Sequence, residues 1–185
     1  MPESKNEASI ASIPFFKSLP PSDLMAILGI TSSKIIATGE NLFDQKDPSD
    51  GLYVLLSGKL QIYIFSGFTG GNPKILKELS PGEYVGEMGL LDGEPRSASV
   101  KALESSEVML IPSAGFAVLL ESHAHIAKVV TDALCDLINN QPKLIIKSAK
   151  STLIKDKKVA PILSNMKALC KILRLFNNQV AVSGR

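Results

Sequence analysis

The chain has 185 residues and a net charge of +2, and 45% of its residues are hydrophobic and 21% charged, a balance typical of a folded globular protein. No uninterrupted apolar run approaches the ~20 residues that a membrane-spanning helix needs, and two cysteines and two histidines are too few for a zinc ribbon or an iron–sulfur framework. The N-terminal residues carry early acidic side chains and no apolar core, so we expect no secretory signal and a cytoplasmic protein.

The first part of the chain predicts a helix followed by a run of strands. Residues 15–28 place apolar side chains at helical spacing, and Ser22 is positioned to cap a helix that begins near Asp23. Between residues 33 and 112 the pattern changes to short β-rich runs separated by Gly, Pro, Asn, Asp and Ser. Ser57-Gly58 predicts a tight turn, and "GFTGGN" a looser hairpin tip. This spacing of turns favours an antiparallel barrel or sandwich.

After Pro112 the helical period returns. Ser113 is a candidate N-cap for a helix whose predicted buried face consists of Phe116, Leu119 and Leu120. Residues 123–141 then repeat apolar side chains in a stripe that is broader than packing against one barrel needs. Pro142 should end or kink this helix.

The remaining residues, 143–185, are strongly basic. They contain eight Lys and two Arg against the single acid Asp156, a net charge of +9, which leaves −7 for residues 1–142. One clear amphipathic helix is predicted here, with Ile162, Leu163, Met166, Leu169, Cys170, Leu173 and Phe176 on its apolar side. We therefore treat residues 143–185 as a basic, largely helical C-terminal extension with its own role.

The stretch "VGEMGLLDGEPRSASVKA", residues 85–102, carries the most specific chemistry. Gly86 lets a ligand approach the backbone, and "EMGLLDG" fits one helical turn whose first N–H groups suit a phosphate oxygen. Glu87 can accept a hydrogen bond from a ribose hydroxyl, Arg96 offers a planar fork of donors for a phosphate, and Ser97 adds a hydroxyl. The residues alone thus indicate a site for a phosphorylated ribose, and the alternative is a surface salt bridge between Glu87 and Arg96.

The same stretch resembles the phosphate-binding cassette of the cyclic nucleotide-binding domain family. This is the module of the bacterial cAMP receptor protein, of cyclic-nucleotide-dependent kinase regulatory regions and of cyclic-nucleotide-gated channels. "GENLFDQKDPSDGLYVLLSGKLQIY" and "LSPGEYVGE" resemble the sequence that precedes the cassette in this family. The resemblance covers residues 13–140. It implies a mainly β fold, an eight-stranded, jelly-roll-like β-roll with an N-terminal helix and two C-terminal helices.

The resemblance also assigns ligand contacts. It implies that Glu87 binds the ribose 2′-hydroxyl, that Arg96 pairs with the cyclic phosphate, and that Ser97 assists. The full set of predicted contacts is Gly86, Glu87, Met88, Arg96, Ser97 and Ala98, with base contacts from Asn139 and Gln141. Gly39 and Gly58 match turn glycines with no ligand role. We expect cAMP as the ligand, with cGMP as the alternative because the Ser97 hydroxyl could reach a guanine, and no further cofactor.

Other chemistry is less favoured. His123 and His125 could suggest a cupin-like metal site, but side chains two apart on a helix point in different directions, so we expect solvated histidines, no metal and no enzyme activity.

The resemblance implies a receptor that forms a homodimer and signals through its C-terminal helices to a partner. The extension could serve as an intramolecular lid or dimer arm, as a docking helix for an acidic protein, or as a contact with anionic lipid. A reduced DNA-binding transcription regulator is the alternative function, although the residues after Pro142 are too few for a winged helix-turn-helix, so nucleic acid is disfavoured.

Overall fold

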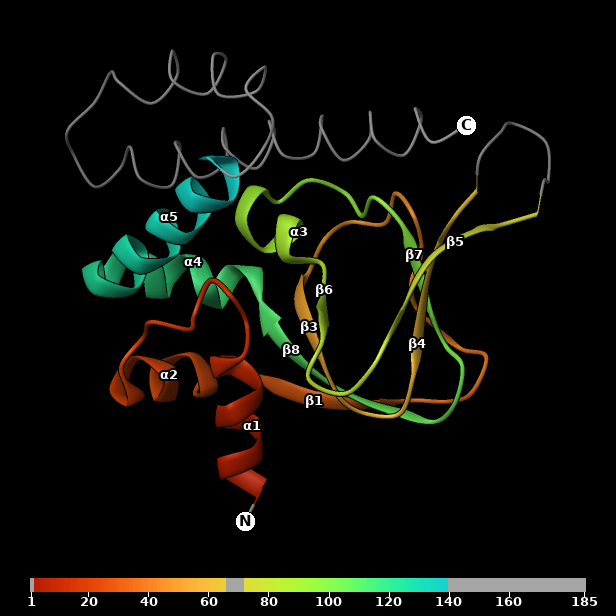
Figure 1. The fold of residues 1–185 in the computed structure, drawn as a ribbon, viewed down its shortest axis with the longest axis horizontal. Helices are drawn as coiled ribbons and strands as arrows, with labels where there is room; N and C mark the ends of the chain where they lie inside the picture. The colour runs from red at the N-terminus through yellow and green to blue at the C-terminus, as the bar shows by residue number, and fades with distance from the viewer. Residues whose placement is uncertain (1, 66–71, 140–185) are drawn as a thin grey trace.

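A computed structural model describes residues 2–65 and 72–139 (Figure 1). The helices are α1 (Pro2–Ala11), α2 (Pro21–Leu28), α3 (Glu87–Asp92), α4 (Ser113–Ser122) and α5 (Ala124–Asn139). The strands are β1 (Ser32–Ile36), β2 (Asn41–Phe43), β3 (Gly51–Ser57), β4 (Leu60–Ile64), β5 (Lys74–Leu79), β6 (Tyr84–Val85), β7 (Ser99–Ala102) and β8 (Ser106–Pro112).

The eight strands form two four-stranded antiparallel sheets. The first sheet has the order β1-β8-β3-β6 and the second the order β2-β7-β4-β5. Only Gly58 and Lys59 separate the end of β3 at Ser57 from β4, and Gly58 adopts a positive φ of 89°, so the predicted tight turn is confirmed. The expected fold class, a mainly β roll with helices at both ends of the chain, is confirmed as well (Figure 1).

Strand β3 is buried on both faces because it separates two hydrophobic cores. Leu52, Val54 and Leu56 pack with the helices, while Tyr53 and Leu55 point into the roll between the sheets. Successive side chains of a strand point to opposite faces, so an uninterrupted apolar run such as "GLYVLL" can supply both cores at once. The first sheet is therefore a central layer, with the helices on one side and the second sheet on the other (Figure 1).

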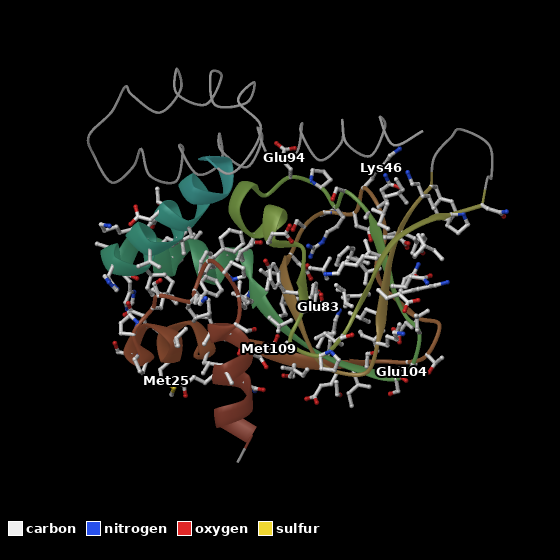
Figure 2. All side chains as sticks on the ribbon, in the orientation of Figure 1. Met25, Lys46, Glu83, Glu94, Glu104 and Met109 are labelled. Carbon is white, nitrogen blue, oxygen red and sulfur yellow. The ribbon has the colours of Figure 1, made fainter. Side chains whose placement is uncertain are left out.

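The C-terminal helices close the helical core as the sequence predicts. Phe116, Leu119 and Leu120 of α4 are all buried, and Ile126 and Val130 of α5 pack in the same cluster. Met109 of β8, labelled in Figure 2, lies fully buried in this cluster. The two helices are separated at His123, close to the boundary that the change of pattern indicates.

Two predicted helix caps are wrong. Helix α2 begins at Pro21 with Pro20 as its N-cap, and α4 begins at Ser113 with Pro112 as its N-cap, and neither has a side-chain cap hydrogen bond. Proline has the φ of a helix and lacks an N–H group that would otherwise need a partner, so it suits the start of α2. The Ser113 hydroxyl instead donates to the carbonyl of Gly89 on α3, at 3.4 Å.

Helix α1 was not predicted, because the sequence pattern places the first helix near Asp23, where α2 lies. Residue Ile10 of α1 is fully buried in the helical core, so long-range packing stabilises a segment whose own pattern is weak. The predicted hairpin tip falls at residues 67–72, and all of it but Asn72 lies outside the described residues, as does the whole extension 143–185. Within the part of the chain that the structure describes, no helix combines the length and apolar character needed to cross a bilayer.

Candidate ligand-binding site

The quoted cassette folds into a short helix held between two glycines. Gly86 precedes α3 with φ 89°, and Gly93 follows it with φ 68°, both in the left-handed region that residues with a Cβ atom avoid. The N–H of Leu90 donates to the carbonyl of Gly86, and the N–H of Gly93 to that of Gly89. The single turn predicted for "EMGLLDG" is thus confirmed, and it starts beside the residues expected to bind the ligand.

Arg96 is a buried cation that reaches the start of this helix. Its side chain is 2% exposed, and its guanidinium carbon lies 4.0 Å from the centre of the Phe43 ring and 5.5 Å from that of Tyr53. A Cβ atom at position 86 would lie 2.1 Å from Nη1 of Arg96, so only glycine leaves room for the guanidinium there. The two ends of the predicted site are therefore in direct contact.

One edge of the Arg96 guanidinium is already paired. Nη2 donates to Oδ1 of Asp50 at 2.5 Å, and the Tyr53 hydroxyl donates to Oδ2 of the same carboxylate. Burial, and then the hydrogen bond to Asp50, raise the pKa of Tyr53 well above its ordinary value, so this hydroxyl stays protonated and remains a donor. Nε and Nη1 of Arg96 are buried with no hydrogen-bond partner in the described structure, and they are available for a second anion.

The loop between β2 and β3, residues 44–50, holds Arg96 in place through the backbone. The N–H of Lys46 donates to the Arg96 carbonyl at 2.8 Å, and the N–H of Arg96 donates to the Asp47 carbonyl at 2.9 Å. In Figure 2, Lys46 and Glu94 mark the side of the roll where this loop and the end of the cassette lie. Lys46 has a positive φ of 77°, which is uncommon for a residue other than glycine.

The loop also contacts α3 through Ser49. A Cβ atom at Gly89 would lie 1.9 Å from the Ser49 Oγ, so the Ser49 side chain fills the space that a side chain at position 89 would take. The Oγ of Ser49 is buried and has no hydrogen-bond partner in the described structure.

The other predicted contacts of the cassette lie at the start of α3 and directly after Arg96. Glu87 is half-buried at the first position of α3, and its charge adds to burial in raising the pKa of Tyr84. Met88 follows it in the helix, Ser97 is exposed and Ala98 is half-buried. Asn139 is the last residue of α5, and Gln141 lies outside the described residues, so the two predicted base contacts are not placed relative to the cassette.

Sequence reasoning missed the partners of Arg96. Phe43, Asp50 and Tyr53 lie 43 to 53 residues before the arginine in the chain, and no local pattern links them to it. The signal that could have found Asp50 is its place in "SDGLY", directly before the doubly buried strand that runs under the cassette. Ser49 was missed for the same reason.

The two histidines contact different partners. Nδ1 of His123 lies 2.9 Å from the Ser122 Oγ, whereas Nδ1 of His125 lies 2.6 Å from Oδ2 of Asp23 on α2. This agrees with the expectation that their side chains point apart. Among the described residues, no group of three or more His, Cys, Asp or Glu side chains could hold a metal ion.

The cassette helix is coupled to the C-terminal helices by packing. Leu90 of α3 is buried in the same cluster as Leu119 and Leu120 of α4 and Ile126 of α5. Together with the Ser113–Gly89 hydrogen bond, this contact means that a displacement of α3 must be accommodated by α4.

Comparison with known proteins agrees with this geometry. The model of the cyclic nucleotide-binding domain matches residues 34–123, a stretch that includes Arg96, loop 44–50 and α3. Residues 34–123 belong to the cyclic nucleotide-binding domain family. The family expected from the cassette is therefore confirmed, and the matched residues are those that bring Gly86, Arg96 and Asp50 together.

Relatives of this cyclic nucleotide-binding domain occur in proteins of different architecture. The chain is 36% identical over 98 residues to the cyclic AMP receptor protein of Thermus thermophilus, covering 53% of this chain and 44% of that protein. It is 30% identical over 125 residues to a cyclic nucleotide-gated potassium channel of Mesorhizobium japonicum, covering 68% of this chain and 33% of the channel. The chain thus spans less than half of the length of either relative.

A solved structure shows the same fold. The N-terminal domain of a transcriptional regulator from Streptomyces coelicolor superposes with a TM-score of 0.66 at 23% identity, covering 81% of this chain and 99% of that domain.

Proposed function

We propose that this domain binds a 3′,5′-cyclic mononucleotide in the cassette and regulates a partner through its C-terminal helices. The observation that carries the proposal is the buried Arg96, which has one edge paired with Asp50 and two donors without a partner beside Gly86. Buried donors without a partner are costly until an acceptor binds them, and the planar fork matches two oxygens of a phosphate. The Thermus thermophilus relative, a cyclic AMP receptor protein by name, supports cAMP as the ligand.

The cassette positions support the pose. Glu87, at the first position of α3, would accept a hydrogen bond from the ribose 2′-hydroxyl, and Gly86 would let the sugar lie against the backbone. Met88, Ser97 and Ala98 would complete the contacts around the sugar phosphate. Asn139 and Gln141 remain our predicted base contacts, and we propose that cAMP binds at least as tightly as cGMP.

The route from ligand to partner would run through α3 and the C-terminal helices. A ligand that draws α3 inward moves Leu90, which lies in the same buried cluster as residues of α4 and α5, and the break at His123 would allow α5 to change its angle. A coupling free energy of ~1–3 kcal/mol would change the exposure of the basic extension about 5- to 150-fold. We propose that the extension contacts a protein partner or a membrane surface, and that the chain forms a homodimer. This makes the domain a receptor rather than an enzyme.

Isothermal titration of the full chain with cAMP, cGMP and cyclic dinucleotides tests the ligand. Arg96→Ala should weaken cAMP binding by about 2–5 kcal/mol, because one partner of a desolvated charge pair is lost. Arg96→Lys should recover only part, since an ammonium cannot make the bidentate contact.

Lys59→Ala is the matched control, because it removes a positive charge at the turn between β3 and β4, away from the cassette. It should leave affinity unchanged. Binding to Arg96→Ala at wild-type affinity would contradict the proposed site.

A further inference from the structure

The buried polar atoms without a partner belong to two side chains that contact glycines at the start of α3. Among residues 2–65 and 72–139, the buried side-chain nitrogen and oxygen atoms that lack a hydrogen-bond partner are Nε and Nη1 of Arg96 and the Oγ of Ser49. Nη1 lies over Gly86, and the Ser49 Oγ lies over Gly89. Residues three apart at a helix start are neighbours on its surface, so the arginine and the serine flank the same first turn of α3.

The nature of these atoms identifies the missing group. Both Arg96 nitrogens can only donate, and a serine hydroxyl can donate as well. Buried polar groups in folded proteins are nearly always hydrogen-bonded, so three such atoms together indicate a bound species rich in acceptors. An oxyanion with several oxygen atoms meets that requirement, and a carbonyl group does not.

The loop that carries Ser49, residues 44–50, also holds Arg96 in place. Loop 44–50 fastens the Arg96 backbone with two hydrogen bonds, and its last residue, Asp50, fixes Nη2. Ser49 directly precedes Asp50, so its hydroxyl is placed by the same contacts. Gly89 has no Cβ atom, and only for that reason can the Ser49 side chain approach α3.

We propose that Ser49 is an additional phosphate-binding residue, whose hydroxyl donates a hydrogen bond to one exocyclic oxygen of the cyclic phosphate while Arg96 binds the other side of the group. This inference rests on the proposed function and adds a residue to it from outside the cassette. Because a hydroxyl adds a donor without adding charge, the site suits the single negative charge of a phosphodiester.

The test is isothermal titration of cAMP into the full chain and its Ser49→Ala variant, combined with thermal unfolding without ligand. A hydrogen bond to a charged group corresponds to roughly a 10-fold or greater change in affinity, so we expect Ser49→Ala to bind cAMP at least 10-fold more weakly. Its melting temperature without ligand should not fall, because the hydroxyl that is removed has no partner there. Ser33→Ala is the matched control: it removes an exposed hydroxyl from β1, at the edge of the first sheet opposite β6 and the cassette, so affinity should stay at the wild-type value.

The two phosphorothioate diastereomers of cAMP separate a direct contact from a packing effect. Sulfur is a weak acceptor, so the loss caused by Ser49→Ala should nearly vanish for the diastereomer whose sulfur replaces the contacted oxygen and persist for the other.

Three results would overturn the proposal. If Ser49→Ala binds cAMP with wild-type affinity while Arg96→Ala binds it more weakly, Ser49 does not bind the phosphate and the proposed function stands. An equal loss for both diastereomers together with a lower melting temperature assigns Ser49 a packing role. No binding of any cyclic mononucleotide to the wild-type chain overturns both the proposed function and this inference.

Discussion

Replacement of Gly86 by alanine tests the placement of Arg96 over the cassette. Two glycines have nearly the same positive φ, 89° at Gly86 and 90° at Gly82, but their surroundings differ. A Cβ atom at Gly82 would meet nothing within 4 Å, whereas one at Gly86 would lie 2.1 Å from Nη1 of Arg96 and 3.0 Å from the Gly51 carbonyl oxygen. Gly82→Ala therefore changes only the backbone energy, and Gly86→Ala also displaces the guanidinium.

The expected magnitudes follow from this difference. A left-handed backbone costs a residue with a Cβ atom about 1–2 kcal/mol, which both variants incur. Gly86→Ala must also break the Arg96–Asp50 hydrogen bond, at about 1.5 kcal/mol, the low end for a charged pair because the Asp50 side chain is 56% exposed. At ~2–4 °C per kcal/mol for a chain of this size, the melting temperature should fall by about 2–8 °C in Gly82→Ala and about 5–14 °C in Gly86→Ala.

Differential scanning calorimetry measures the melting temperature of each variant, and titration with cAMP measures its affinity for the ligand. Gly82→Ala should bind like the wild type, while Gly86→Ala should bind at least ~10-fold more weakly, equivalent to about 1.4 kcal/mol. If Gly86→Ala loses no more stability than Gly82→Ala and keeps wild-type affinity, a side chain fits at position 86 and Arg96 does not lie there.

Three further predictions concern other parts of the chain. The hydrogen bonds from Lys77 and from the Ser80 N–H hold the pKa of Glu83 below its ordinary value. Ionised Glu83 therefore stabilises the fold fully at a pH above the ordinary pKa, and this stabilisation is lost as the pH falls through the lowered pKa. Thermal unfolding should therefore show Glu83→Gln less stable than the wild type at neutral pH and equal to it in acid, and a difference that does not vary with pH would contradict this. We expect a homodimer through the apolar stripe from Ile126 to Ile138 in α5, and sedimentation at micromolar concentration would refute it by finding a monomer with and without cAMP. Hydrogen exchange across residues 158–178 should change on cAMP binding, and truncation after Gln141 should alter cAMP affinity. If neither changes, the extension is an independent appendage. Salt-dependent binding of duplex DNA that requires the extension would favour the DNA-binding alternative.

Local patterns were sufficient for the elements whose neighbours along the chain determine them. The run "GLYVLLSGKLQIYIF" predicts two strands around a glycine turn because its β-rich composition and the conformational freedom of Gly58 are local properties, and β3 and β4 confirm it. The apolar face of α4 was predicted for the same reason, since Phe116, Leu119 and Leu120 share one side of a helix at any position in a fold. The cassette is a third case, because its glycines, acid and arginine lie within one segment.

The sequence by itself determined the family, the order of the strands along the chain and the residues of the cassette, since each depends on spacing within a short window. Only the tertiary structure decided what those residues contact. Whether Ser113 caps α4 or binds the Gly89 carbonyl depends on where α3 packs. Asp50 and Phe43, which are the partners of Arg96, come from distant parts of the chain. Ser49 meets Gly89 only because loop 44–50 folds over α3. Hydrogen bonds and close packing act between atoms a few ångströms apart, so they are set by the folded arrangement and not by separation in sequence.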